Sequence, residues 1–447
     1  MWFEQALLPD GWAEHVRLEL CDGRITAVAR AVARRPGEAR HGIALPGLCN
    51  LHSHAFQRAM AGLTERAGPD GDDFWSWREL MYRFLARLTP ADVQAIAALA
   101  YIEMLESGFT RVGEFHYLHH GPDGRFYDHR AEMAEAIGAA AEESGIALTL
   151  LCSFYAHSDF GGATPQPGQR RFINTLDGFA ELVAQSRSII NRLNAANIGI
   201  APHSLRAVTP EELSRLQALW PEGPIHIHAA EQRREVEACI ARLGAPPVGW
   251  LLDHASIDAR WCLVHATHMT TAETVGLAKS GAVAGLCAQT EANLADGIFP
   301  ARDYLRAGGR FGLGTDSNIV IDASSELRGI DYAQRLLLGR RNPLAHGSSS
   351  GRTLFAAAST GGAQALGVAA EGLKPGACAD IVTLKSDAIA LLSRRDDSIL
   401  DSWIYASRAS AIGEVWRGGR KLVSGGQHVA RPRILARYRK ILPGLLS

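Results

Sequence analysis

The sequence predicts an α/β fold, a (β/α)8 TIM-type barrel with a small β-sandwich domain built from both chain ends. Two observations predict it: eight strand-like segments alternate with helical ones along the middle of the chain, and short alternating β segments occur at both ends. Parallel strands joined by right-handed helical crossovers close into such a barrel. We therefore expect a barrel over residues 46–370 and a composite β domain formed by residues 1–45 and 371–447.

The expected barrel strands are short apolar segments separated by helical ones. They are Ile43–Phe56, Thr110–Tyr117, Ala147–Tyr155, Asn197–Leu205, Pro224–Ala230, Trp261–His265, Ala282–Gln289 and Arg310–Thr315. The carboxyl ends of such strands all lie at one face of the barrel, where active sites of this fold are built. Side chains at these strand ends are therefore the first candidates for function.

Two of the intervening helices begin with the same signal. Thr89 and Thr209 each precede a proline and an acidic first turn, an arrangement typical of a helix start. Apolar residues then recur at helical spacing over residues 93–105, and Gly108 can end that helix. We expect helices directly after both threonines.

Both chain ends have β-strand patterns. Asp22 and Gly23 form a turn dipeptide between two alternating segments near the start of the chain. Residues 373–384 and 413–423 alternate again, with glycine pairs that supply turns. We expect the two ends to pair with each other beside the barrel.

Charge and composition exclude several classes of partner. Lys and Arg total 46 and Asp and Glu total 47, a net charge of −1 at pH 7, so nothing attracts the chain to nucleic acid or anionic lipid. No run of about 18 apolar residues occurs. The seven cysteines never form a C-x-x-C pair, which indicates free thiols in a reducing compartment. We therefore expect a cytoplasmic enzyme that binds neither nucleic acid nor a membrane.

Residues of metal-ligand type stand at the ends of four expected strands. His52 and His54 share one face of the first strand, so both can meet one cation. His228 ends the fifth strand, His265 the sixth and Asp316 the eighth. Each motif is weak alone, because 17 histidines in 447 residues make chance pairs common. Structural roles alone would not place all five residues at strand ends.

This joint arrangement resembles the amidohydrolase superfamily, and the resemblance covers almost the whole chain. The motifs that carry it are Leu45-Pro46-Gly47 before the H-x-H pair, H-x-x-E from His228, His265, Thr315-Asp316 and the closing residues 374–382. The resemblance implies one divalent metal ion held by His52, His54, His228 and Asp316.

Three residues beside that metal would carry the proton transfers of a hydrolysis. Asp316 can take a proton from water while it remains a ligand, and His265 can orient the attacking oxygen and stabilise developing charge. Glu231 directly follows the fifth strand and is placed to protonate a departing nitrogen. The products would be ammonia and an oxo compound.

The distribution of lysine bears on the number of metal ions. Superfamily members with two metals commonly bridge them through a carboxylated lysine on strand 4, but the first lysine of this chain is Lys279. We therefore expect a mononuclear site. Zinc suits three imidazoles and one carboxylate, and Fe2+ would also accept these ligands.

Four segments around these ligands are similar to formimidoylglutamate deiminases, a family that hydrolyses N-formimino-L-glutamate to N-formyl-L-glutamate and ammonia in histidine degradation. The segments are residues 54–63, 74–82, 114–120 and 201–206. They are more specific than the metal ligands. They imply a small-molecule, dianionic substrate.

Such a substrate carries two carboxylates and a formamidinium, so its site needs fixed cations at one end and a carboxylate near the metal. Arg78 and Arg206 are the candidates for the substrate carboxylates, because a guanidinium can bind a carboxylate through two parallel hydrogen bonds. Gln57, Tyr117 and His203 would complete the hydrogen bonds. Arg78 stands in a tryptophan-rich stretch, so surface stacking on an indole remains an alternative for it.

Other interpretations stay open at the level of sequence. An aromatic-base deaminase of the same superfamily, of guanine or adenosine-analogue type, would prefer a stacking slot with amide donors. A non-catalytic amidohydrolase-like interaction protein would lack metal ligands, and a binuclear amidase or lactonase would hold a second metal. Dimers are frequent in the superfamily, so a homodimer is expected by analogy. No role is assigned to Glu114, His116, His119, His120 and His226.

Overall fold

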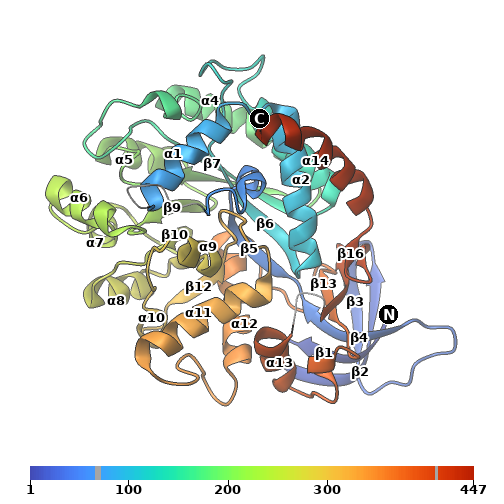
Figure 1. The fold of residues 1–447 in the computed structure, drawn as a ribbon. Coiled ribbons are helices and arrows are strands. Elements are labelled where there is room, and N and C mark those ends of the chain that lie inside the picture. The colour runs from blue at the N-terminus through green and yellow to red at the C-terminus, as the bar shows by residue number, and fades with distance from the viewer. Residues whose placement is uncertain (66–71, 408–410, 447) are drawn as a thin grey trace.

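The computed structural model describes residues 1–65, 72–407 and 411–446 (Figure 1). Eight parallel strands close into a barrel in chain order from β5 to β12, which confirms the expected fold class. The strands are β5 (Leu48–Ser53), β6 (Phe109–His116), β7 (Ala147–Phe154), β8 (Asn197–Pro202), β9 (Ile225–Ala229), β10 (Trp261–His265), β11 (Val283–Leu286) and β12 (Arg310–Leu313). Each of the eight expected segments overlaps one of them.

Side chains fill the interior of the barrel. β7, β9 and β10 are buried along their full length, because helices cover the outer face. Leu51 of β5 packs between two glycines: a Cβ at Gly285 or Gly312 would lie 2.9 Å or 2.4 Å from a methyl carbon of Leu51. The packed interior leaves the carboxyl ends of the strands as the place for a site.

Helices connect the strands and surround the barrel (Figure 1). They are α1 (Phe74–Leu85), α2 (Pro90–Glu106), α3 (Glu132–Ser144), α4 (Leu176–Ile190), α5 (Pro210–Leu219), α6 (Arg233–Leu243), α7 (Pro247–His254), α8 (Thr271–Ser280), α9 (Ala288–Asn293), α10 (Ala301–Arg306), α11 (Ala323–Leu338) and α12 (Ser350–Ala365), with short 3-10 turns η1 (Ala55–Met60), η2 (Pro167–Gln169) and η3 (Ile389–Leu391). Thr89 and Thr209 cap α2 and α5 as expected, accepting the backbone N–H of Asp92 and Glu212. Gly108 follows α2 with a φ of +102°.

The two chain ends meet in one separate sheet, as expected. Its strands, in spatial order, are β16 (Gln427–His428), β15 (Arg420–Ser424), β14 (Ile412–Arg417), β13 (Ile381–Leu384), β4 (Arg40–Pro46), β1 (Trp2–Leu8), β2 (Gly11–Cys21) and β3 (Arg24–Ala29). β4 pairs with β1 in parallel and with β13 antiparallel. This one strand therefore joins the N-terminal half of the sheet to the C-terminal half.

The prediction of a single strand over Ile43–Phe56 is wrong. The chain leaves the separate sheet at the end of β4 and enters the barrel with β5. Gly47 lies at the crossing, where its N–H donates to Asp380 O at 3.1 Å and a Cβ would lie 2.3 Å from Thr110 Oγ1. The sequence pattern does not show this change of sheet, because buried apolar residues occur in both strands.

The C-terminal region also contains two helices that the strand pattern conceals, α13 (Ser398–Ala406) and α14 (Arg431–Leu446). α14 runs back along α2 of the barrel (Figure 1), where Arg431 pairs with Glu106. Its apolar residues recur at the helical positions 434, 438, 441 and 445. The division of the chain at residues 46 and 370 stays a prediction. Among the described residues, no helix has both the length and the apolarity needed to cross a membrane.

Candidate active site

The structure brings the four expected metal ligands together at the carboxyl face of the barrel. His52 lies in β5, His54 directly follows that strand, His228 lies in β9, and Asp316 follows β12. All four side chains are buried. The parallel barrel explains this meeting, because strands that are distant in the chain end at the same face.

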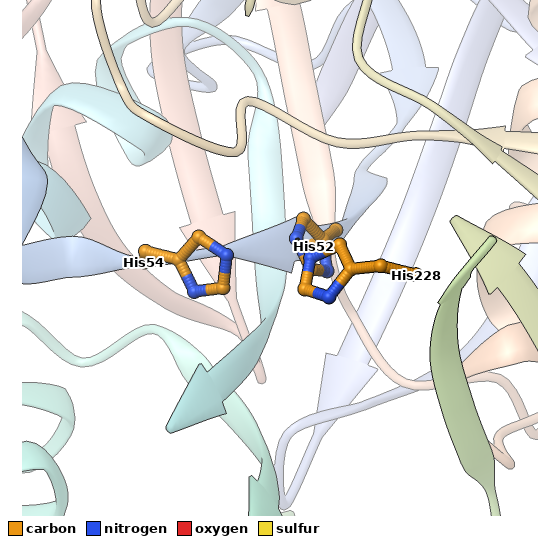
Figure 2. A group of neighbouring side chains, drawn as sticks. All are labelled: His52, His54 and His228. Carbon is orange, nitrogen blue, oxygen red and sulfur yellow. Dashed lines mark hydrogen bonds between the residues drawn. The ribbon is translucent and has the colours of Figure 1, made fainter. Parts of the chain in front are cut away.

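The three imidazoles present their Nε2 atoms to one another (Figure 2). The Nε2 atoms of His52 and His228 lie 3.1 Å apart. The Nδ1 atoms of His54 and His228 each lie 2.9 Å from a backbone carbonyl oxygen, of Phe115 and His203 respectively. Each Nδ1 therefore carries the proton that it donates, and each Nε2 keeps a free lone pair. Burial lowers the pKa of His52 to about 3, which favours the neutral form that binds a metal.

Asp316 supplies a fourth donor beside this cluster. Its Oδ1 lies 3.4 Å from Nε2 of His52 and 3.4 Å from Nε2 of His54. Its backbone is tied to β5, because its N–H donates to His52 O and its carbonyl accepts the N–H of His54. Burial opposes ionisation of this carboxyl, but the neighbouring imidazoles, His52 foremost, hold its pKa below the usual range. Three imidazoles and one carboxylate are a donor set that fits a divalent metal ion.

Glu231 and His265 lie on the other side of Asp316. Nε2 of His265 is 3.6 Å from Glu231 Oε1 and 3.8 Å from Asp316 Oδ2. Burial raises the pKa of Glu231 to about 7. Burial opposes the protonation of His265, but the surrounding carboxylates outweigh it and raise its pKa. A carboxyl that can be protonated near neutral pH thus faces an imidazole that favours its charged form.

Glu291 is a neighbour of this pair that the sequence analysis missed. It lies in α9, after β11, and its Oε1 is 3.3 Å from His265 Nδ1 and accepts the N–H of Cys287 at 3.0 Å. The carboxylate fixes the orientation of the His265 ring. Since Glu291 stands two residues beyond the expected seventh strand, the strand-end criterion would have found it if carboxylates had been searched there.

A cavity opens beside the cluster. All five expected substrate-binding residues line it, as do most of the residues described above; its polar lining is formed by His54, Gln57, Arg78, Tyr82, Tyr117, Tyr155, His203, Arg206, His228, Glu231, His265 and Asp316. The apolar part of the lining is Phe74, Trp77, Met81, Phe172 and Leu294. One cavity therefore joins the metal-ligand cluster to the two expected arginines.

The two arginines are held around one indole. The Cζ atom of Arg78 lies 4.4 Å and that of Arg206 5.5 Å from the ring centre of Trp75. Both Nε atoms are buried, and neither has a hydrogen-bond partner in the part of the chain that the structure describes. Arg78 does stack on an indole, and it lines the cavity as well. Stacking and a free Nε together indicate guanidiniums that are fixed in place for an external anion.

Gln57 and Tyr117 form a pair next to His54. Nε2 of Gln57 donates to Tyr117 Oη at 3.1 Å, and the ring of Tyr117 lies 4.9 Å from that of His54, centre to centre. The Oε1 atom of Gln57 is buried without a partner among the described residues. His203 contributes its backbone oxygen to His228 and its ring to the cavity. The rings of Tyr117 and His203 therefore pack against the imidazole cluster.

Two family models match the chain. One, described as the amidohydrolase family, matches residues 43–422, and the other, described as the N-terminal domain of formimidoylglutamate deiminase HutF, matches residues 2–42. The chain belongs to the amidohydrolase family. Amidohydrolase members depend on metal ions, and the buried histidines of this chain form a group that could hold one.

Several relatives resemble this amidohydrolase over nearly their whole length. A formimidoylglutamate deiminase of Pseudomonas aeruginosa is 46% identical over 99% of both chains. An 8-oxoguanine deaminase of the same organism is 28% identical, with 95% of this chain and 94% of the relative covered. The crystal structure of an amidohydrolase from Brucella melitensis is 50% identical, has a TM-score of 0.97, and is matched over 100% of this chain and 99% of its own.

The other polar residues noted in the sequence are internal to the amidohydrolase fold. Glu114 accepts the N–H of Ala55, and ring nitrogens of His119, His120 and His226 lie near the backbone oxygens of Ser153, Ile173 and Ala365. Nε2 of His116 has no partner among the described residues. None of these five side chains lines the cavity that the described residues form.

Proposed function

We propose that this amidohydrolase hydrolyses N-formimino-L-glutamate to N-formyl-L-glutamate and ammonia, a step of histidine degradation. The observation that carries the proposal is the pair of guanidiniums whose buried Nε atoms have no partner among the described residues, in the same cavity as a metal-ligand cluster. The relative from Pseudomonas aeruginosa, a formimidoylglutamate deiminase, and the matched HutF domain support it.

The chemistry of the substrate matches the two ends of the cavity. Its two carboxylates would bind Arg78 and Arg206, with further hydrogen bonds from Gln57, Tyr117 and His203. Its formimino group would then face the acidic end, where carboxylates stabilise a cationic amidine. A neutral aromatic base carries no negative group for the two guanidiniums to bind.

The site would hold one divalent metal ion, zinc by preference and Fe2+ as an alternative. His52, His54, His228 and Asp316 would bind it, and the chain before Lys279 offers no lysine for a bridged second metal. Such an ion, when bound, makes water more acidic and polarises the carbon that is attacked.

The side chains around that ion would move the protons. Asp316 would accept a proton from the attacking water at Oδ2, the oxygen that faces His265. His265 would orient the water and offset the negative charge that develops. Glu231, with its pKa near 7, would donate the proton that the departing nitrogen needs. As the carbon–nitrogen bond to the terminal nitrogen breaks, the remaining hydroxyl proton would pass to the carboxylate that Glu231 becomes, and the carbonyl of the formyl group forms.

The remaining proposals concern location and partners. We place the enzyme in the cytoplasm, since its seven cysteines are free thiols. Its partners would be its small dianionic substrate and a second copy of the chain in a homodimer. A net charge of −1 supports the absence of nucleic-acid and membrane binding.

The test is a comparison of substrates on metal-replete protein. Ammonia release is followed with N-formimino-L-glutamate, guanine and an adenosine analogue, and metal content is measured on the same sample. We expect rapid release from the first substrate alone and about one metal ion per chain. Faster release from either base would favour the aromatic-base deaminase, to which the 28% identical relative lends support. A protein without metal or turnover would favour an interaction protein, and about two ions per chain a binuclear enzyme.

A further inference from the structure

Two phenols stand at the arginine end of the cavity without an assigned role. Tyr82 of α1 and Tyr155, which directly follows β7, both line the cavity. Their side chains are buried. The Tyr155 hydroxyl lies within electrostatic reach of both Arg206 and Arg78. Any carboxylate that binds these guanidiniums is therefore near the phenols.

Gln169 of η2 determines which way these hydroxyls can donate. Its Oε1 accepts the backbone N–H of Gln166 at 2.8 Å, so the amide cannot be turned over without loss of that bond. Its Nε2 then donates to Tyr155 Oη at 2.8 Å and to Tyr82 Oη at 3.4 Å. Gln169 is fully buried, so no solvent competes for these bonds.

Each phenol thus accepts from the amide and has its own proton left to donate. Both oxygens lie within hydrogen-bond distance of the same amide nitrogen, so the hydroxyls are neighbours and one of them can donate to the other. The second proton still has no protein acceptor in the hydrogen bonds of the described residues. Burial raises the pKa of Tyr155, which keeps that hydroxyl protonated.

The rings are held in place from several sides. Phe172 packs against Tyr82 and Tyr155, with ring centres 6.0 Å and 5.7 Å away. A Cβ at Gly168 would lie 2.8 Å from the ring of Tyr82, so η2 touches α1 directly at this point. The hydroxyl pair is therefore fixed before a ligand enters, which reduces the entropy lost on binding.

We propose that Gln169 is a positioning residue that turns the hydroxyl pair of Tyr82 and Tyr155 toward the cavity, where the pair donates a hydrogen bond to a carboxylate held by Arg78 and Arg206. The two guanidiniums and the free phenol proton then all offer donors to the same ligand group. This end of the site selects a carboxylate, which only accepts, against a primary amide, whose NH2 group would face other donors. The inference rests on the proposed function, since it deepens the account of the same substrate.

The experiment uses glutarate, a dicarboxylate without the amidine, so that binding is measured without turnover. Isothermal titration calorimetry of the metal-replete enzyme compares the wild type with Tyr82→Phe, Tyr155→Phe and the double variant. We expect the double variant to raise the Kd of glutarate about 10-fold or more, the usual effect of losing a hydrogen bond to a charged group. With N-formimino-L-glutamate, KM should rise similarly while kcat stays within about threefold.

Matched variants separate this role from a general loss of structure. Tyr304→Phe removes another buried phenol hydroxyl, one that donates to backbone oxygens of Ala282 and Arg310, and it should leave the Kd of glutarate unchanged. Gln169→Glu replaces the donor by an acceptor that draws both phenol protons, so it should weaken glutarate binding more than Gln169→Met does. Circular dichroism and thermal unfolding identify any variant that does not fold.

The outcomes distinguish this inference from the proposed function. A double variant whose glutarate Kd stays within about twofold of the wild type would overturn the inference, whatever the substrate is. If glutarate binding falls as expected but the wild type does not hydrolyse N-formimino-L-glutamate, the hydroxyl pair still binds carboxylates and the proposed reaction is wrong. If the double variant does not fold, the Gln169 variants decide: equal Kd values for Gln169→Glu and Gln169→Met would overturn the positioning role.

Discussion

The two ends of the cavity are built in different ways. At the metal-ligand end, His52 and His228 lie within barrel strands, and the backbone of Asp316 is hydrogen-bonded to β5 on both sides. At the arginine end, Arg78 comes from helix α1 and Arg206 from the segment after β8, and both guanidiniums lie over the indole of Trp75. The barrel thus fixes the proposed metal ligands, while connecting segments supply the residues proposed to bind the substrate, as expected for this fold.

The largest effect is expected at the metal-ligand end. Glu231→Gln should lower kcat about 10²- to 10⁴-fold, because the departing nitrogen loses its proton donor. KM should change little, since Glu231 is not one of the residues proposed to bind the substrate carboxylates. Steady-state kinetics checks this, with the metal content measured to show that the cluster is intact. A variant with normal kcat would remove Glu231 from the mechanism.

The arginine end should respond through affinity. Arg206→Ala and Arg78→Ala should each raise KM about 100-fold, the cost of leaving a substrate carboxylate without its charged partner in a buried site. Arg206→Lys should recover only part of the loss, because lysine cannot form the bidentate fork.

Arg234→Ala is the matched control for the arginines. Arg234 also lies over Trp75, with Cζ 4.6 Å from the ring centre, but it does not line the cavity. We expect its KM to stay near that of the wild type. Equal losses in all three alanine variants would mean that stacking on Trp75, rather than carboxylate binding, is what matters.

Glu291 is an exception to this division between barrel and connecting segments. It lies in α9, after β11, but it contacts His265 at the metal-ligand end. In Glu291→Gln the amide oxygen can take the place of Oε1 and keep both contacts, to the N–H of Cys287 and to His265 Nδ1, but the negative charge that helps to raise the pKa of His265 is lost. We expect kcat to fall about 10-fold with KM unchanged, as for other groups that orient an active-site imidazole. A rise in KM without loss of kcat would assign Glu291 to ligand binding.

The smallest effect is expected outside the cavity, at Glu38 in the segment between β3 and β4. Hydrogen bonds from Arg17, and then from the backbone of Arg35, lower the pKa of Glu38 to about 2, from 4.5. A lowered carboxyl pKa stabilises the fold above the unfolded pKa, and this contribution is lost as pH falls from about 4.5 to 2. The urea midpoints of wild type and Glu38→Gln should therefore differ at pH 7 and converge toward pH 2. Turnover at neutral pH should not change.

The sequence predicted the barrel and the meeting of its strand ends because both follow from local periodicity and from one topological rule. His52, His228 and Asp316 needed only their position after apolar segments. Arg78 and Arg206 could not be found that way, since their meeting around Trp75 depends on how α1 folds over the barrel. They were named through a family resemblance, and their roles, like those of the metal ligands, stay predictions.

Other features could not be predicted from the sequence, because each depends on a contact with a segment that is distant in the chain. Gln169 stands in an unremarkable polar loop, and its importance appears only when its amide meets two phenols from distant segments. The change of sheet at Gly47 is invisible in a continuous apolar run. The helical spacing of the apolar residues in α14 could have predicted this helix. The β pattern of the preceding segments instead led to the expectation of a β domain through to residue 447.

Because β4 passes directly into β5, the C-terminal part of the chain supports the strand that carries His52. β13 holds one edge of β4, and five residues beyond Gly47 stands His52. A shortened chain that lacks β13 would leave the start of β5, the strand that carries His52, without this support. Loss of β13 should then weaken binding of the proposed metal ion before the barrel itself unfolds.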